Sequence, residues 1–311
     1  MDFDIFIKIL VAAIASGTPF VYAALGELIT EKSGVLNLGV EGMMLVGAIC
    51  GFIGMATTGS IFVAVVCGMA AGAFMAGIFA LLTLSLMANQ VASGLALTIF
   101  GVGLSSFLGL NYTSVALSGV PELHIPLLSD IPVMGELLFS HDILIYCSLF
   151  LFAAVSWFLS KTKAGLVLRG IGEAPKSAHA LGYNVIAIRY IAVLFGGAMA
   201  GLGGVYLCIA YTPMWVEGMV AGRGWVSLAL VVFATWRPAR VMIGAYLFGG
   251  ITVAQFHVQG FGIEIPSQLL SMLPYISTII VLVFISRDPT TIRLNSPASL
   301  GATYHPSQPH S

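Results

Sequence analysis

Long runs of apolar residues occupy most of this chain, and they constrain its fold more than any other feature. Of the 311 residues, 59% are hydrophobic and only 8% are charged. A soluble domain carries about 25% charged residues, so these few charges cannot cover a soluble globule. Because a helix needs about 20 apolar residues to cross a bilayer, we predict an all-α, polytopic transmembrane bundle of about eight to ten spans, with broken or re-entrant segments.

Nine hydrophobic segments are apparent, and the seventh is too short to cross a membrane alone. Either residues 212–224 are partly re-entrant, or the seventh and eighth segments form a broken pair. Irregular backbone at membrane depth occurs only where protein or a watery cavity covers it. The nine predicted segments are 6–29, 38–57, 60–87, 91–110, 142–160, 188–211, 225–236, 241–258 and 270–286.

The distribution of Lys and Arg predicts the side of the membrane that each loop faces, because cytoplasmic loops are enriched in them. Residues 161–189 contain five basic residues and one acid, whereas residues 111–142 contain four acids and no base. We expect the first loop to be cytoplasmic, and the second loop and the N-terminus to be external. The transmembrane domain then covers 1–288, and the polar residues 289–311 form a disordered cytoplasmic tail. The same assignment places Lys32, Arg237, Arg240, Arg287 and Arg293 inside.

No pattern in the chain indicates catalysis or metal binding. The sequence contains neither a GxxxxGK[ST] phosphate loop nor an HExxH zinc motif. Its histidines and four cysteines show no ligand spacing, and a net charge of −1 gives no reason to expect nucleic acid. We therefore predict no catalytic residue, no metal site and no cofactor in this chain. It would move or conduct something, and any ATP chemistry would belong to another subunit.

Two segments differ from lipid-facing helices, and the first covers residues 30–44, TEKSGVLNLGVEGMM. A Gly-containing turn precedes Asn37, a candidate helix cap, and Glu41 falls in the first turn of the next helix. Both residue types are favoured there for structural reasons alone. Alternatively, Asn37 and Glu41 line a polar pathway, since ionisable groups inside spans usually face a cavity. Asn89 and Gln90 present the same choice, between capping the fourth segment and lining the pathway.

The second segment is the cytoplasmic loop at 162–188. Pro175 suits the first turn of a short helix, and Gly182 suits its end. Ala174, Ala178 and Leu181 are spaced i, i+4 and i+7, which predicts a shared apolar face. So short a helix is not stable alone, and it needs a partner in this chain or in another protein.

These segments together resemble the membrane permease subunits of ABC importers of the branched-chain amino acid, ribose and nucleoside class. The nucleoside and simple-sugar branch is the most similar. The resemblance covers about residues 23–284, and at Ala234 and His179 the chain departs from residues common in relatives, Gly and Arg. The resembling segments are EKSGVLNLGVEGMML from Glu31, NQVASGLAL from Asn89, GEAP from Gly172, and GWVSLA from Gly224 followed by Trp236-Arg237-Pro238.

The resemblance implies a permease subunit of an ATP-driven importer for nucleosides or related sugars, with several spans in the bacterial cell (inner) membrane. Residues 1–288 would be the permease domain. Asn37, Glu41, Asn89 and Gln90 would supply its substrate pathway. The alternatives are an ABC permease for branched-chain amino acids or another small solute, an ion-coupled secondary transporter or channel that uses Glu41, and a membrane scaffold that transports nothing.

The resemblance also implies partners. Cytoplasmic ATPase subunits would carry ATP and Mg and would dock on the loop at 162–188. A second permease, a paralogue or a copy of this chain, would complete the pathway, and an external solute-binding protein would deliver the solute. The expected ATPase-coupling residues are Glu173, Ala174, Pro175, Ala178, Leu181 and Gly182.

Overall fold

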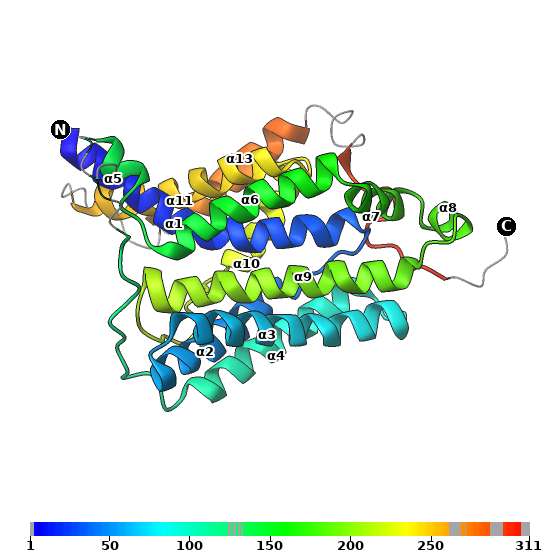
Figure 1. Ribbon diagram of the computed structural model, residues 1–311, viewed down its shortest axis with the longest axis horizontal. Coiled ribbons are helices and arrows are strands. Elements are labelled where there is room, and N and C mark those ends of the chain that lie inside the picture. The colour runs from blue at the N-terminus through cyan, green and yellow to red at the C-terminus, as the bar shows by residue number, and fades with distance from the viewer. Residues whose placement is uncertain are drawn as a thin grey trace.

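The computed structural model describes residues 3–123, 126, 129, 131, 133–260, 269–270, 272–286 and 295–305. Its long helices lie side by side along one axis (Figure 1). Two of them, α3 and α9, continue into π-helical turns, η1 (Leu81–Ser85) and η2 (Leu207–Tyr211). The helices are α1 (Phe3–Lys32), α2 (Val40–Thr58), α3 (Ile61–Ala80), α4 (Gln90–Gly109), α5 (Met134–Leu138), α6 (Ile143–Lys161), α7 (Lys163–Glu173), α8 (Pro175–Ala180), α9 (Val185–Tyr206), α10 (Arg223–Phe233), α11 (Pro238–Gly260) and α13 (Leu273–Ser286).

Six helices in the described residues are long and apolar enough to cross a membrane: α1, α2, α3 with η1, α4, α6, and α9 with η2. Each of the nine predicted segments coincides with a helix, which confirms the all-α polytopic fold. The seventh, α10, has only 11 residues. A turn follows it in which Thr235 and Trp236 have φ of 49° and 52°. This turn separates α10 from α11.

Close glycine contacts join α2, α3 and α9. A Cβ added to Gly47 on α2 would overlap the Cα of Gly201 on α9. One added to Gly72 on α3 would overlap the carbonyl oxygen of Gly197 on α9. Lipid provides little hydrophobic drive between helices, so such close approach supplies much of the association energy. These glycines therefore pack the bundle from within one subunit.

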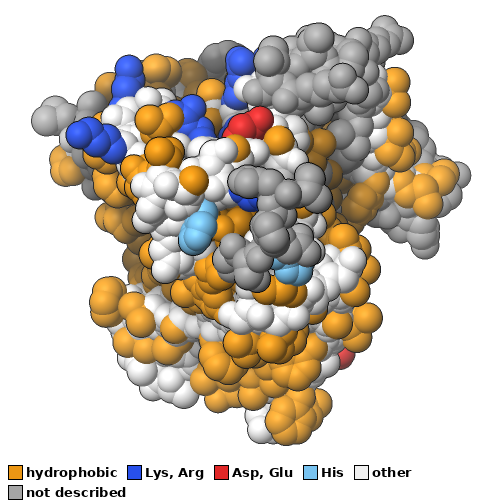
Figure 2. Space-filling model, turned by 90° about the vertical axis from the view of Figure 1, so that its right-hand side faces the viewer, with side chains coloured by type: hydrophobic (Ala, Val, Ile, Leu, Met, Phe, Trp, Pro, Cys, Tyr) orange, Lys and Arg blue, Asp and Glu red, His pale blue; other side chains and the backbone are white. Residues whose placement is uncertain are grey.

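The predicted cytoplasmic segments lie together at one end of the bundle. The C-terminal end of α1, with α7 and α8, occupies this end, and α5 lies at the opposite end (Figure 1). Trp236 also lies at this end, where its side chain contacts Glu31 near the C-terminal end of α1. Figure 2 looks onto this end and shows Lys and Arg side chains gathered in its upper part. Arg287 and Arg293 lie outside the described residues.

Residues 295–305, part of the predicted tail, lie against this same end. The Lys32 Nζ donates to the carbonyl oxygen of Asn295 (2.7 Å), and the Gly301 N–H donates to that of Gly34 (3.2 Å). The prediction of a disordered tail is therefore wrong for residues 295–305. The physical reason is that helix ends leave backbone carbonyls without helical partners, and this segment supplies donors for them. Residues 289–294 and 306–311 lie outside the described residues.

Candidate functional site

The chain between α1 and α2 turns back and runs along α4. The Leu36 N–H donates to Oε1 of Gln90 (2.8 Å), and Oγ1 of Thr98 donates to the carbonyl oxygen of Leu38 (3.0 Å). Gly94 allows the close approach, because a Cβ there would lie 2.8 Å from the Leu38 nitrogen. We call residues 33–39 the re-entrant segment. Side chains of α4 thus pair two of its free backbone groups, as irregular backbone in a membrane requires.

Asn37 lies fully buried within this segment. Its N–H donates to Oε1 of Glu27 on α1 (3.2 Å), and its Oδ1 accepts from the Gly39 N–H (2.9 Å). Gly39, rather than Asn37, is the N-cap residue of α2. Asn37 therefore stabilises the turn before the helix. Asn89 is the N-cap of α4, with its Oδ1 accepting from the Ala92 N–H (2.9 Å), which confirms the capping interpretation for that residue.

Glu41 binds the beginning of α10 rather than its own helix end. Its Oε1 accepts from the Gly222 N–H and its Oε2 from the Gly224 N–H, both at 2.7 Å. The first N–H groups of a helix have no partner within it, and a carboxylate there also suits the helix dipole. Gly222 has φ of 83°, and a Cβ on Gly224 would lie 2.6 Å from the Glu41 Cα. The two glycines thus allow the carboxylate to reach α10.

A second buried carboxylate holds the other end of α10. Nε1 of Trp236 donates to Oε2 of Glu31, which is fully buried on α1. Trp236 belongs to the left-handed turn that ends α10, and Arg240 stabilises this turn by donating to Oγ1 of Thr235 (2.7 Å). The half-helix therefore lies between an acid of α1 and an acid of α2. We call α10 with Glu31, Glu41 and Trp236 the α10 site.

Three residues of this region, Glu27, Glu31 and Trp236, were not predicted as functional residues from the sequence. Glu27 and Glu31 are one helical turn apart and 1% and 0% exposed, and each retains one carboxylate oxygen without a hydrogen-bond partner. Burying ionisable groups is costly, so such acids usually have a specific task. The sequence carried a signal for Glu27, because very few acids fall inside the apolar segments, whereas Glu31 lies just beyond the predicted segment 6–29. Asn37, the partner of Glu27, is ten residues away, but Trp236, the partner of Glu31, is 205 residues away.

The loop at 162–188, which is predicted to be cytoplasmic, contains two short helices, α7 and α8. Pro175 occupies the first turn of α8, and Gly182, with φ of 89°, follows its end, as predicted. The predicted shared face is wrong. Ala178 packs inside against Ile171 and Val185, whereas Ala174 is exposed and Leu181 is 78% exposed. The reason is that α8 has only six residues, and Ala174 and Leu181 are its cap residues at either end rather than members of the helix.

Further contacts connect this loop with the re-entrant segment. Arg189 of α9 is buried, and its Nε donates to the carbonyl oxygen of Ser33 (3.0 Å), while its Nη2 donates to Oγ of Ser299 (3.0 Å). The Ser299 Oγ in turn donates to the carbonyl oxygen of Gly172 at the end of α7 (2.6 Å). Glu173 Oε2 accepts from the N–H of Ala298 (3.3 Å). The arrangement can transmit movement of the loop to the re-entrant segment.

Among the described residues, no group of three or more His, Cys, Asp or Glu side chains is placed to hold a metal ion.

The sequence of the chain matches a known protein family. The model of the branched-chain amino acid transport system permease component matches residues 9–282. A putative glucose ABC transporter permease protein of Haloferax volcanii is 38% identical, over 94% of this chain and 96% of its own. A nucleoside ABC transporter permease protein of Lactococcus lactis is 33% identical, over 85% and 88%, and a guanosine ABC transporter permease protein of Bacillus subtilis is 33% identical, over 92% and 95%. No solved structure matches the chain. The chain therefore belongs to this family of ABC transporter permease components and is a membrane protein with several spans.

Proposed function

We propose that this chain is the permease subunit of an ABC importer for nucleosides or related sugars. The observation that carries the proposal is the similarity, over most of both chains, to permeases named for nucleosides, guanosine and glucose. These solutes share a ring rich in hydroxyl groups. The re-entrant segment and the broken α10 support a transport role, because transporter sites are often built from interrupted helices.

The proposed assembly contains three kinds of partner. Cytoplasmic ATPases, which bind ATP and Mg, would dock on the loop at 162–188, where Leu181, Lys176 and Glu173 are exposed. A second permease, a paralogue or a copy, would complete the pathway, and an external binding protein would deliver solute. Each nucleotide state of the ATPase would favour a different arrangement of the permeases, which shifts the population between outward- and inward-facing forms.

Within the proposed pathway, the four candidate residues would act in two ways. Asn89 is exposed and would contact solute directly. Asn37, Glu41 and Gln90 are buried and bonded within the chain, so they would position the re-entrant segment and α10 in this conformation. The geometry of Glu41 also bears on the alternative of an ion-coupled transporter. Both of its oxygens already bind backbone N–H groups, which favours a positioning role over proton coupling.

The proposal is tested by reconstituting the purified assembly, with its ATPase and partner permease, in vesicles. We expect ATP-dependent uptake of labelled guanosine or glucose in the presence of the binding protein, and little uptake of labelled leucine. Uptake of leucine alone would replace the proposal by the branched-chain amino acid alternative. Uptake driven by an ion gradient through this chain alone, without ATPase, would contradict it in favour of a secondary transporter.

A further inference from the structure

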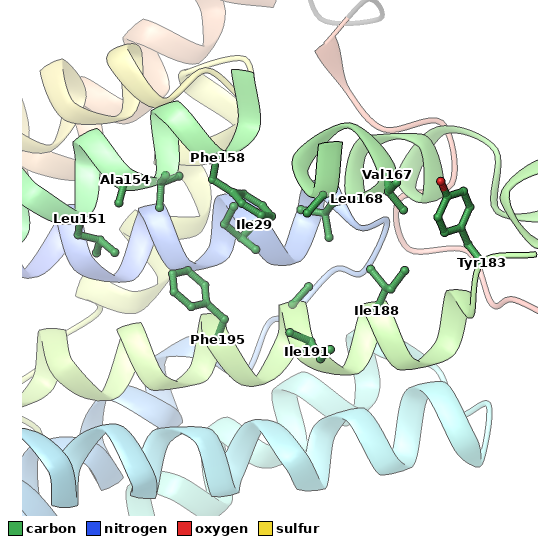
Figure 3. A pocket seen from close by; sticks show the side chains of 13 residues that line it. Ile29, Leu151, Ala154, Phe158, Val167, Leu168, Tyr183, Ile188, Ile191 and Phe195 are labelled. Carbon is green, nitrogen blue, oxygen red and sulfur yellow. The ribbon is translucent and has the colours of Figure 1, made fainter. Parts of the chain in front are cut away.

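A deep apolar groove opens on the side of the bundle near its cytoplasmic end. Its cavity measures about 610 Å³, within the range of roughly 300–1,000 Å³ typical of ligand pockets. Twelve of its thirteen lining side chains are hydrocarbon, and Tyr183 adds the single hydroxyl (Figure 3). Its walls come from four helices: Ile29 of α1, Phe158 of α6, Leu168 of α7, and Ile188 and Phe195 of α9. We call it the α6–α9 groove.

The groove opens on the outer surface of the bundle rather than into its interior. Ile191 in its wall is 68% exposed, and Tyr183 at its cytoplasmic end is 43% exposed. Figure 3 shows Leu151, Ala154 and Phe158 of α6 on one side and Ile191 and Phe195 of α9 on the other. If the groove stayed empty, its lining side chains would have no van der Waals contacts on one side. Lipid hydrocarbon is therefore expected to fill it.

Three basic residues lie near the cytoplasmic end of the groove. Lys161 and Lys163 are exposed at the junction of α6 and α7, between the lining residues Phe158 and Ala164. Arg169 is exposed on α7. No Asp or Glu lies between Asp142 and Glu173, so no acid close in sequence neutralises Lys161 and Lys163, whereas Arg169 lies one helical turn before Glu173 on α7. An amphipathic helix with basic residues on its polar face, such as α7, is typical of a membrane interface.

A second apolar groove provides the comparison. It measures about 470 Å³ and lies between α3 and α9, lined by Ala70, Phe74 and Leu194 among others. The sequence contains no Lys or Arg between Lys32 and Lys161, so α3 contributes no cation to its edge. Both grooves can take up hydrocarbon, but only the α6–α9 groove joins hydrocarbon to several positive charges.

We propose that the α6–α9 groove binds an acyl chain of an anionic phospholipid from the cytoplasmic leaflet, with its phosphate held by Lys161 and Lys163. Anionic lipids attract basic residues near the cytoplasmic surface by roughly 1 kcal/mol per residue, about a fivefold effect on binding. The lipid would connect the membrane to the coupling loop, because Val167 and Ile188 line the groove and also pack against the cluster of Ile171, Ala178 and Val185.

The test measures lipid retained by the purified full-length protein, by native mass spectrometry after exchange into phosphatidylglycerol or phosphatidylcholine. We expect wild type to retain phosphatidylglycerol in preference to phosphatidylcholine. The double substitution K161Q/K163Q, on two exposed residues, is expected to lower phosphatidylglycerol retention by about tenfold or more. Ala154→Phe is expected to lower retention of both lipids, because it fills the groove.

Two matched controls accompany these variants. Ala70→Phe makes the same change in the second groove, and K176Q removes a cation of the same loop that lies away from the groove; both should retain phosphatidylglycerol like wild type. Equal retention by wild type and K161Q/K163Q would overturn the proposal. So would a disulfide between Ile191→Cys of two copies, which would show that protein covers the groove. Because the readout is lipid retention, failure here leaves the proposed transport function untouched.

Discussion

The cluster of α2, α3 and α9 is held together by close glycine contacts, whereas the region around α10 is held by buried carboxylates. In the first region, Gly47, Gly72 and Gly201 bring continuous helix backbones into direct contact. In the second, Glu31 and Glu41 bind the two ends of a half-helix. The two regions share α2, which contributes Gly47 to the first and Glu41 to the second.

The difference follows from whether the backbone is continuous. A complete helix satisfies its own N–H and C=O groups, so two such helices need only approach closely. A helix that begins inside the bundle exposes N–H groups, and one that ends there exposes C=O groups; lipid satisfies neither, so polar groups of the protein must reach them. Buried acids in this chain therefore mark the breaks, and small residues mark the uninterrupted contacts.

The largest effect is expected from Gly201→Leu. The added side chain would separate α9 from α3 and α2, and overpacking alone costs about 1–3 kcal/mol or more. We expect little folded protein by size-exclusion chromatography in detergent. The control is Gly103→Leu on α4, where an added Cβ meets nothing within 4 Å. A normal elution profile for Gly201→Leu would show that glycine contacts do not hold this region together.

The next effect is expected from Glu41→Gln. The amide nitrogen cannot accept, so at least one of the N–H groups of Gly222 and Gly224 loses its partner, at about 1–3 kcal/mol. We expect a lower melting temperature and loss of ATP-dependent uptake. Glu122→Gln, in the loop opposite the coupling end, serves as the control for removing one acid. Unchanged stability and uptake in Glu41→Gln would contradict its role at the α10 site.

A smaller effect is expected from Trp236→Phe. This change keeps most of the ring but removes the donor to Glu31, and leaving one buried group unpaired costs about 1–2 kcal/mol. Thermal unfolding in detergent would measure it, with Trp157→Phe, at a residue 64% exposed on α6, for comparison. If both variants unfold at the same temperature, Glu31 does not hold the end of α10.

Ser299→Ala is expected to have a more local effect. It removes hydrogen bonds with Arg189 and Gly172, each worth about 0.5–1.5 kcal/mol. We expect faster hydrogen exchange in α8 and in residues 295–305, with little change in α2 and α3. Ser160→Ala, which removes only a bond within α6, provides the reference. Unchanged exchange in α8 would mean that residues 295–305 do not stabilise the loop at 162–188.

The smallest effect on stability is expected from Leu181→Asp. The side chain is 78% exposed, so the permease should fold normally while co-purification with the ATPase decreases. Ala178→Arg would not test docking, because Ala178 packs inside and the substitution would disturb the loop itself. Normal recovery of the ATPase with Leu181→Asp would exclude this residue from the docking surface.

Local rules of sequence predicted part of this structure well. Pro175 and Gly182 fixed the limits of α8, because each acts through its own backbone conformation. Asn89 capped α4 for the same local reason. The predicted shared face of Ala174, Ala178 and Leu181 was wrong because α8 has only six residues, and Ala174 and Leu181 are its cap residues. The position of residues 295–305 was not predicted, since their partners are carbonyl groups elsewhere in the chain.

The sequence by itself determined that this chain is a helical membrane protein, where its helices fall and which segments are basic. These properties depend on composition and spacing along the chain, because apolar segments of sufficient length are stable in lipid as helices. Only the tertiary structure decided that Glu41 binds Gly222 and Gly224, and that Glu31 binds Trp236. The partners are about 180–205 residues apart. The physical reason is that a buried polar group needs a partner wherever the fold brings one within hydrogen-bond distance, and spacing along the chain does not reveal that place.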